Sequence, residues 1–421
     1  MNGDRSPLPA GFEYRLDLAR HVTPRLLKDQ PVHRWFYFPH SYSPQLVEVL
    51  LDEWQLGSKA VILDPFVGAG TTLRVAGERG LDAVGVDVSP LATFVSRAKV
   101  ARYGRNEVQE ALRAVLADVE QAAATDVDRT DRLERAFSDA EFDILLRLRE
   151  SIGRQSAEVQ PLLLLALLRV QQTISRARPD GGWFRWVERE NQAHLIRPAF
   201  AETVMGMLQD LASAPSLNGA RSEVRQLDAR RLDLLVENSA IATGGFDAII
   251  TSPPYPNRHD YSRVFQIELL TLGLQESDIF SLRYDSIRSH VEARPPQGHV
   301  LPFRPTPLLQ QTLAQLPETI DRRVRAMLWG YFEDMNAVLQ SACTVLRPEG
   351  RIALVVGNVR HAGVMVPVDE ILVEMGVALG YEPLTSWVAR MRGNSAQQMG
   401  RFGREPARES IVMLRKRDPN R

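Results

Sequence analysis

The sequence predicts an α/β protein built on one mostly parallel sheet, with a long helical insertion. Several short apolar runs end abruptly in an acidic residue or in prolines, as strands buried on both faces of a sheet do. Segments with helical periodicity follow most of these runs, which is the alternation of an open α/β fold. The alternation stops between residues 101 and 222, where helical patterns follow one another. We therefore expect a sheet domain that carries a helical insertion.

Seven segments have the pattern of strands, and the last two are expected to form an antiparallel hairpin at the sheet edge. These strands are 60–64, 83–87, 224–229, 246–251, 351–356, 382–389 and 409–414. The expected helices are 44–56, 112–124, 141–152, 159–174, 199–212, 262–272, 321–346 and 367–379. The first of them has Ser43 as its N-cap and Pro44 at its first helical position. Residues 347–350 are expected to form a turn.

This pattern divides the chain into an N-terminal arm and a catalytic domain that is interrupted once. The arm is 1–30, the catalytic domain is 31–100 and 223–421, and the helical insertion is 101–222. An arginine- and proline-rich segment without a regular pattern, 276–318, lies within the catalytic domain. The insertion and this segment, alone or together, are candidates for a target-recognition region.

Composition narrows the class of protein. The chain of 421 residues is 44% hydrophobic, which is enough to bury a large core. No apolar run reaches transmembrane length and no apolar signal region begins the chain, so we expect a cytoplasmic protein with no membrane partner. The single cysteine, Cys343, excludes an internal disulfide and a cysteine-based zinc site, and we expect no metal. With a net charge of -1, a nucleic-acid-binding protein must concentrate its positive charge locally.

The end of the first strand predicts a nucleoside site without a phosphate cradle. Asp64 ends the strand, and Gly68 and Gly70 permit a tight turn before the next helix. Leu73 stands where a dinucleotide fingerprint would require a glycine, and Asp64 would repel a phosphate. Asp87 ends the second strand, where a carboxylate can bind ribose hydroxyls. S-adenosylmethionine fits this pattern because it has a ribose, an adenine and an amino-acid end but no phosphate.

Residues 251–255, with the sequence Thr-Ser-Pro-Pro-Tyr, follow a buried strand and predict a rigid site for a planar ring that carries an amino group. The prolines hold the chain extended as it leaves the strand. Ser252 and backbone carbonyls would accept hydrogen bonds there, with the ring of Tyr255 beside them. A structural turn is the alternative interpretation of these five residues alone.

Three segments are candidates for contact with nucleic acid. Arg258 and the loop 390–404 combine arginines for phosphates with amides that can read base edges, namely Arg390, Arg392, Asn394, Gln397, Gln398 and Arg401. Residues 183–186 interleave aromatic and basic side chains, which can either stack on bases or anchor a loop to the core. The arginines of the segment 276–318 form either a solvated loop or, as we favour, a phosphate-contacting surface; they are Arg283, Arg288, Arg294 and Arg304.

Together these motifs resemble those of the amino-group DNA methyltransferases, over residues 31–100 and 224–415. The resemblance implies a Rossmann-like, seven-stranded class I methyltransferase sheet whose last strand is reversed, S-adenosylmethionine as methyl donor and double-stranded DNA as substrate. Its cofactor residues here would be Tyr42, Asp64, Pro65, Phe66, Gly68, Gly70, Thr71, Thr72, Asp87 and Asp228. In this scheme Tyr42 closes over the methionine end, Asp87 binds the ribose and Asp228 binds the adenine. The catalytic residues would be Ser252, Pro253, Pro254 and Tyr255.

The target of the reaction is narrowed by two residues. Ser252 stands where many members of the family carry Asp or Asn, which resembles the N4-cytosine subgroup and places N6-adenine second. Cys343 lacks the strand-end setting that C5 methylation of cytosine requires, and we expect it in the core. RNA base methylation and a binding-only protein remain alternatives, and a restriction or defence nuclease is a candidate partner. The recognition sequence and the oligomeric state do not follow from the sequence.

Overall fold

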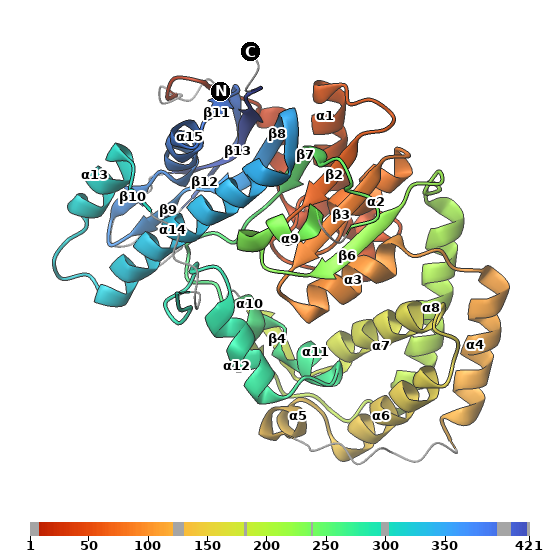
Figure 1. The fold of residues 1–421 in the computed structure, drawn as a ribbon. Coiled ribbons are helices and arrows are strands. Elements are labelled where there is room, and N and C mark those ends of the chain that lie inside the picture. Colours follow the sequence, from red (N-terminus) through yellow and green to blue (C-terminus); the bar gives the residue numbers. More distant parts are fainter. Residues whose placement is uncertain are drawn as a thin grey trace.

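A sheet of nine strands forms the centre of the protein in a computed structural model that describes residues 8–120, 130–180, 183–236, 239–295, 303–393 and 406–418 (Figure 1). The strand order is β1-β12-β13-β8-β7-β2-β3-β6, and β11 pairs with β13 beside this path. The strands are β1 Phe12–Tyr14, β2 Val61–Asp64, β3 Asp82–Asp87, β6 Ser222–Gln226, β7 Phe246–Thr251, β8 Leu346–Gly357, β11 Tyr381–Pro383, β12 Ser386–Arg392 and β13 Ala407–Lys416.

The predicted α/β class is confirmed, whereas the sheet has two more strands than expected. Strands β6, β3, β2, β7 and β8 run parallel, and β13 runs antiparallel to both β8 and β12. One additional strand, β1, comes from the N-terminal arm and pairs in parallel with β12. The other, β11, comes from the segment that was expected to be one continuous strand over 382–389. The arm also contains the 3-10 helices η1 Leu16–Arg20 and η2 Pro24–Asp29, so it is not irregular throughout.

Helices cover both faces of the sheet, which explains why its central strands are apolar along their whole length. On one face Ile62 and Ile250 pack with α1 Pro44–Trp54 and α2 Thr71–Glu78. On the other face Leu63 and Ile249 pack with α14 Arg322–Val345 and α15 Val368–Ala378. Two further helices continue from the sheet, α3 Pro90–Val100 and α9 Asp233–Val236. Strand β8 begins at Leu346, so the turn expected at 347–350 is instead part of an irregular strand.

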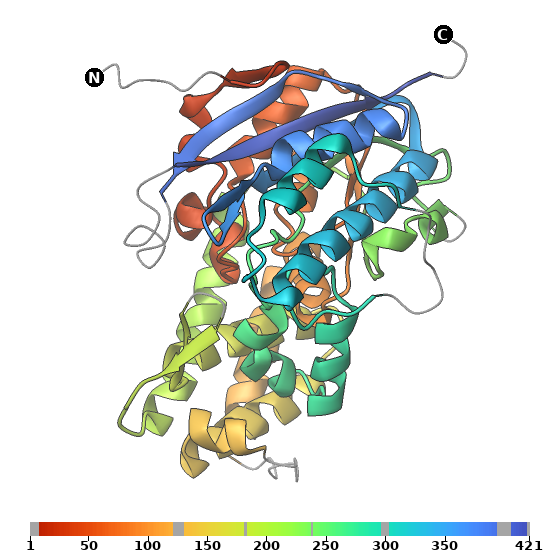
Figure 2. The same cartoon turned by 90° about the vertical axis from the view of Figure 1, so that its left-hand side faces the viewer.

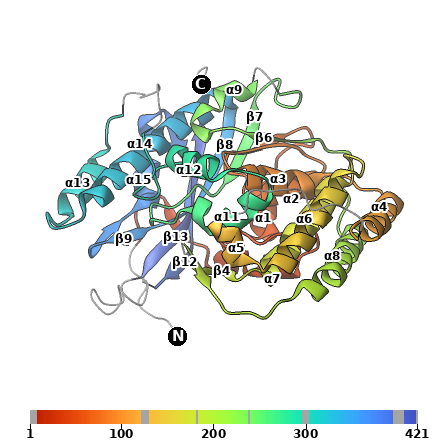
Figure 3. The ribbon, with the colours of Figure 1, turned by 90° about the horizontal axis from the view of Figure 1, so that it is seen from below.

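A second group of helices lies below the sheet in Figures 1 and 2 and is seen from below in Figure 3. It contains α4 Arg105–Asp118, α5 Asp131–Ala136, α6 Asp139–Gly153, α7 Gln160–Ile174 and α8 Ala193–Ser213. Helices α10 Tyr261–Val264, α11 Gln266–Thr271 and α12 Glu276–Asp285 join this group, and residues such as Phe265 and Leu269 belong to the same core as α7. The helix expected over 262–272 is split in two at Phe265. The helices of the insertion share one hydrophobic core with residues of α11 and α12.

Two expected loops are ordered by local contacts. Strands β4 Ala177–Asp180 and β5 Trp183–Trp186 pair antiparallel. Phe184 is buried, and Arg135 lies 4.3 Å above the ring of Trp186, which supports the interpretation of this motif as an anchor to the core. The segment 276–318 contains α12 and α13 Pro307–Gln315, because a capping box at Gln275 and a cap at Thr306 start these helices.

The remaining short elements are η3 His33–Trp35, η4 Ala229–Arg231, β9 Val359–His361 and β10 Val364–Val366. Within the described ranges, no helix combines the length and apolar character needed to cross a membrane.

Candidate active site

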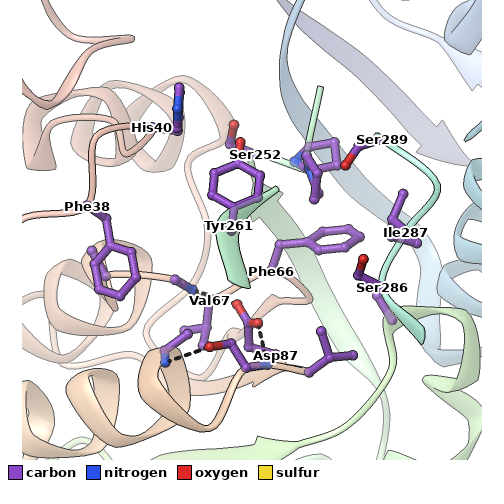
Figure 4. Close-up of a pocket in the computed structure, with 18 of the residues that line it drawn as sticks. Phe38, His40, Phe66, Val67, Asp87, Ser252, Tyr261, Ser286, Ile287 and Ser289 are labelled. Atoms are coloured by element: carbon purple, nitrogen blue, oxygen red, sulfur yellow. Dashed lines mark hydrogen bonds between the residues drawn. The ribbon is translucent and has the colours of Figure 1, made fainter. Parts of the chain in front are cut away.

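One pocket lies at the carboxyl ends of β2, β3 and β7, where an open α/β sheet binds its ligands (Figure 4). Twelve of the predicted site residues line it: Tyr42, Asp64, Pro65, Phe66, Gly68, Thr71, Asp87, Asp228, Ser252, Pro253, Pro254 and Tyr255. The predicted cofactor and catalytic motifs therefore share one cavity, although Asp64 and Ser252 lie far apart in the chain. Gly70 and Thr72 do not line the pocket.

Asp64 ties three segments together beneath the pocket. Its carboxylate is 1% exposed and accepts hydrogen bonds from the Tyr42 hydroxyl (3.1 Å) and the Thr251 hydroxyl (2.6 Å). It also accepts from the backbone N–H of Phe66 (3.2 Å). Burial raises the pKa of Asp64 to about 6, because the charged form loses its hydration. Thr72 contacts the Tyr42 hydroxyl from below and donates to the Ile250 carbonyl, so it supports the site without facing the cavity.

Asp87 holds the glycine-containing loop in place. Its carboxylate accepts from the backbone N–H of Gly68 (3.1 Å) and of Ser89 (2.9 Å), and burial raises its pKa to about 6. Gly70 has a φ of 75°, and a Cβ there would lie 3.0 Å from the Cα of Ser96. This glycine is therefore required by the conformation and by the close approach of α3, not by contact with a ligand.

Asp228 lies at the pocket but is not a free carboxylate. It accepts from the Arg230 guanidinium, with an Nη2–Oδ2 distance of 2.6 Å. The same guanidinium also contacts Asp334 and the Asp285 carbonyl, which fixes it among several acceptors. Any adenine contact by Asp228 would use the lone pairs that this ion pair leaves.

Ser252 and Tyr255 leave β7 with their side chains oriented by neighbouring strands. The Ser252 hydroxyl donates to the Val355 carbonyl (3.0 Å), so its oxygen retains lone pairs that can accept a hydrogen bond. The Tyr255 hydroxyl donates to Glu409 (3.2 Å), and the Arg392 guanidinium lies 5.7 Å from its ring centroid. Burial raises the pKa of Tyr255 well above its ordinary value, so the hydroxyl stays protonated.

The structure adds aromatic residues that the sequence did not identify as site residues. Phe38, His40 and Tyr261 lie at the pocket, with His40 and Tyr261 edge to face at 5.3 Å (Figure 4). Burial lowers the pKa of His40 to about 4, so its ring is neutral near pH 7. Residues 38–42 line the cavity, whereas Trp35 and Phe36 belong to the core. Residues 35–42 are thus in part core and in part a pocket wall, while nothing in the sequence singled out Tyr261.

The segment after α12 supplies a further part of the pocket that was not expected. Its pocket residues are Ser286, Ile287, Ser289 and His290. Two arginines of the same segment, Arg283 and Arg288, are not available for the expected phosphate-contacting surface, because their guanidinium groups form ion pairs within the protein. Arg283 is buried and pairs with Asp260 (2.7 Å), and Arg288 is buried and pairs with Asp334 (2.6 Å).

The described residues among those predicted to contact nucleic acid, Arg258, Arg390 and Arg392, do not line the pocket. Arg258 is exposed at a φ of 73°, Arg390 pairs with Glu409, and Arg392 packs on Tyr255. Asn394, Gln397, Gln398 and Arg401 lie outside the described residues. Cys343 is partly buried in α14 against the core, as expected. Within the part of the chain that the structure describes, no cluster of His, Cys, Asp and Glu could hold a metal ion.

Comparisons with known proteins point to methyltransferases. No family model matches the chain. The Type II methyltransferase M.BsoBI of Geobacillus stearothermophilus is 25% identical over 439 residues, which span 92% of this chain and 86% of that protein. The Type II methyltransferase M.AvaI of Nostoc sp. is 29% identical over 424 residues, which span 92% of this chain and 87% of that protein. These similarities support a methyltransferase.

The comparison with solved structures gave a weaker similarity. The rRNA methyltransferase aviRa from Streptomyces viridochromogenes is 13% identical, with a TM-score of 0.33 over 95% of this chain and 93% of that one. At this TM-score the likeness carries no argument about fold or function.

Proposed function

We propose that this protein transfers a methyl group from S-adenosylmethionine to the exocyclic amine of a base in double-stranded DNA. The observation that carries the proposal is the shared pocket, in which buried carboxylates and the Ser-Pro-Pro-Tyr strand end face the same cavity. The similarity to Type II methyltransferases over 92% of the chain supports it. Within the nine-stranded sheet, the parallel strands flanked by the reversed β13 are consistent with the class I methyltransferase arrangement.

The pocket residues suit the methyl donor. Asp87 would accept hydrogen bonds from the ribose hydroxyls, because its carboxylate has lone pairs beyond those used by Gly68 and Ser89. Phe66 and Ile287 offer apolar surface for the adenine ring on the same side of the cavity (Figure 4). Asp64 supplies negative charge that suits a cationic ligand. When bound, S-adenosylmethionine supplies an electrophilic methyl group on its sulfonium.

The strand end would prepare the amine. An exocyclic amine is a poor nucleophile, since its lone pair is delocalised into the base. The Ser252 oxygen would accept a hydrogen bond from one N–H of the amine, because the Ser252 hydroxyl already donates its own hydrogen to the Val355 carbonyl. The Pro253 carbonyl would accept a hydrogen bond from the second N–H, and the ring of Tyr255 would stack on the base. Such positioning accounts for much of the rate in a direct transfer.

The base must leave the duplex to reach this pocket, and stacking on Tyr255 offsets part of the cost of flipping. We infer that cytosine N4 is the favoured target, because a serine stands at position 252; adenine N6 is the alternative. Arg258 is the exposed arginine nearest in sequence to the catalytic motif and would contact a phosphate. A restriction nuclease that cuts the same sequence is the expected partner in the cell.

The proposal is tested by incubating the purified protein with tritium-labelled S-adenosylmethionine and mixed-sequence duplex DNA. Label is expected in the DNA, and Ser252→Ala should reduce its rate of incorporation by about 10- to 100-fold, the worth of one lost hydrogen bond in the transition state. Ser58→Ala is the matched control, because Ser58 is exposed and does not line the pocket. Label that enters RNA but not DNA, or cofactor binding without transfer to either, would contradict the proposal.

A further inference from the structure

The back of Tyr255 is held by side chains that do not line the pocket. Strands β7, β8, β13 and β12 follow one another in the sheet (Figure 1), and Tyr255 lies just after the end of β7 in the sequence. Glu409 on β13 lies opposite Gly357 of β8 and opposite Arg390 of β12 in the two registers. Arg390, Glu409 and Gly357 therefore lie side by side on three neighbouring strands. The hydroxyl of Tyr255 donates a hydrogen bond to Glu409, the middle one of the three (3.2 Å).

Glu409 is a buried carboxylate whose partners are the tyrosine and one arginine. The residue is 3% exposed; one carboxylate oxygen accepts from Tyr255 and the other accepts from the Nε of Arg390. A buried carboxylate without partners would be costly, so the pair with Arg390 stabilises Glu409 beside the tyrosine hydroxyl. Glu409 is absent from the pocket lining, and it therefore cannot act on a substrate directly.

Gly357 provides the space that the ring needs. A Cβ at this position would lie 3.0 Å from the Cε2 atom of Tyr255 and 2.8 Å from a guanidinium nitrogen of Arg392. The Arg392 guanidinium itself lies 5.7 Å from the centre of the ring. The ring is thus confined by the bare backbone of Gly357, by a guanidinium over it, and at its hydroxyl by a carboxylate.

We propose that Glu409, held by Arg390, is a positioning residue that holds the Tyr255 ring at the place where the target base stacks. The inference rests on the proposed function, because it assigns the tyrosine to base stacking. The backbone of Gly357 and the Arg392 guanidinium limit rotation of the ring about its Cβ–Cγ bond. The hydrogen bond at the hydroxyl limits the swing of the whole ring about the Cα–Cβ bond, so the stacking surface is in place before the base arrives. It also gives Arg390 a role inside the protein, in place of the phosphate contact that its sequence context suggested.

The inference predicts how variants of the pair behave in the methyl-transfer assay. Glu409→Ala should lower kcat about tenfold, the worth of one hydrogen bond to a charged group, with the dissociation constant of the cofactor unchanged. Glu409→Gln should retain most of the rate, because its amide oxygen can still accept from the tyrosine. Tyr255→Phe keeps the ring but loses the hydroxyl, so it should match Glu409→Ala. Glu382→Ala is the matched control, since Glu382 pairs with Arg415 at the sheet edge, away from the pocket.

A double-mutant cycle separates positioning from a general effect on the fold. If Glu409 acts through the tyrosine hydroxyl, Tyr255→Phe combined with Glu409→Ala should be no slower than the slower single variant. Effects on kcat that multiply in the double variant, or a Glu409→Ala variant with the wild-type rate, would overturn the inference. Wild-type protein that transfers label to no DNA would instead refute the proposed function, so the two failures are distinguishable.

Discussion

The affinity for S-adenosylmethionine should depend on pH below neutrality, because two pocket carboxylates titrate there. Burial raises the pKa of Asp64 to about 6 and that of Asp87 to about 6 in the cofactor-free protein. With a pKa of about 6, each carboxyl is roughly one-tenth ionised at pH 5 and roughly nine-tenths ionised at pH 7. The hydroxyl and ammonium groups of the cofactor donate hydrogen bonds, so they bind the ionised forms. Affinity therefore rises as pH rises through the folded pKa and levels off above it.

The size of the effect follows from the ionised fraction. Since apparent affinity scales with the fraction of protein that is competent to bind, each required carboxylate contributes about a tenfold change between pH 5 and pH 7. Two such carboxylates together give about a hundredfold change. Isothermal titration calorimetry with the wild type and with Asp87→Asn measures it, and the variant should retain only the tenfold share of Asp64. An affinity that is flat over this range, or that is tighter at pH 5, would refute the assignment of these carboxylates to the cofactor.

Three further predictions concern packing, stability and DNA contact. Gly85→Ala places a Cβ 2.5 Å from a methyl carbon of Val67 and should lower the free energy of unfolding by about 1–3 kcal/mol in urea denaturation, whereas Gly153→Ala, with open space around it, should not lower it. Burial raises the pKa of Asp64, so the folded state binds its proton more tightly than the unfolded state does. This group should therefore lower the free energy of unfolding of the cofactor-free protein by about 1 kcal/mol as pH rises from 5 to 7.5, and Asp64→Asn should remove that share of the pH dependence. Arg258→Ala should weaken binding to duplexes of any sequence and reduce the slope of log affinity against log salt by about 1 in fluorescence anisotropy.

The sequence alone was enough to predict the candidate site residues that lie at the ends of strands. Asp64, Asp87 and Ser252 each follow a buried apolar run, and such runs in a parallel sheet direct their carboxyl ends to one edge. The period-2 and continuous apolar patterns therefore predicted both the sheet and the convergence of distant motifs on one pocket. The helix boundaries were less well predicted, as with the split at Phe265, because tertiary packing rather than local propensity decides where a helix breaks.

The roles of the arginines could not be derived from the sequence alone. Arg283 and Arg390 stand in arginine-rich segments that suggest phosphate contacts, yet their partners Asp260 and Glu409 come from other parts of the fold. Local charge counts do not reveal such pairs, since the pairing depends on strand register and helix packing. The contribution of Tyr261 to the pocket has the same origin, because the packing of α10 against α12 and β5 depends on the tertiary fold.

The central claim is that the strand end at Ser252 acts on an exocyclic amine. The most direct measurement is the identity of the methylated nucleoside, obtained by digesting duplex DNA after reaction with labelled S-adenosylmethionine and separating the products by liquid chromatography and mass spectrometry. We expect the methylated nucleoside to be N4-methylcytosine, with N6-methyladenine as the alternative product of the same chemistry. Label recovered as 5-methylcytosine, or no methylated nucleoside from a protein that binds both cofactor and DNA, would contradict it.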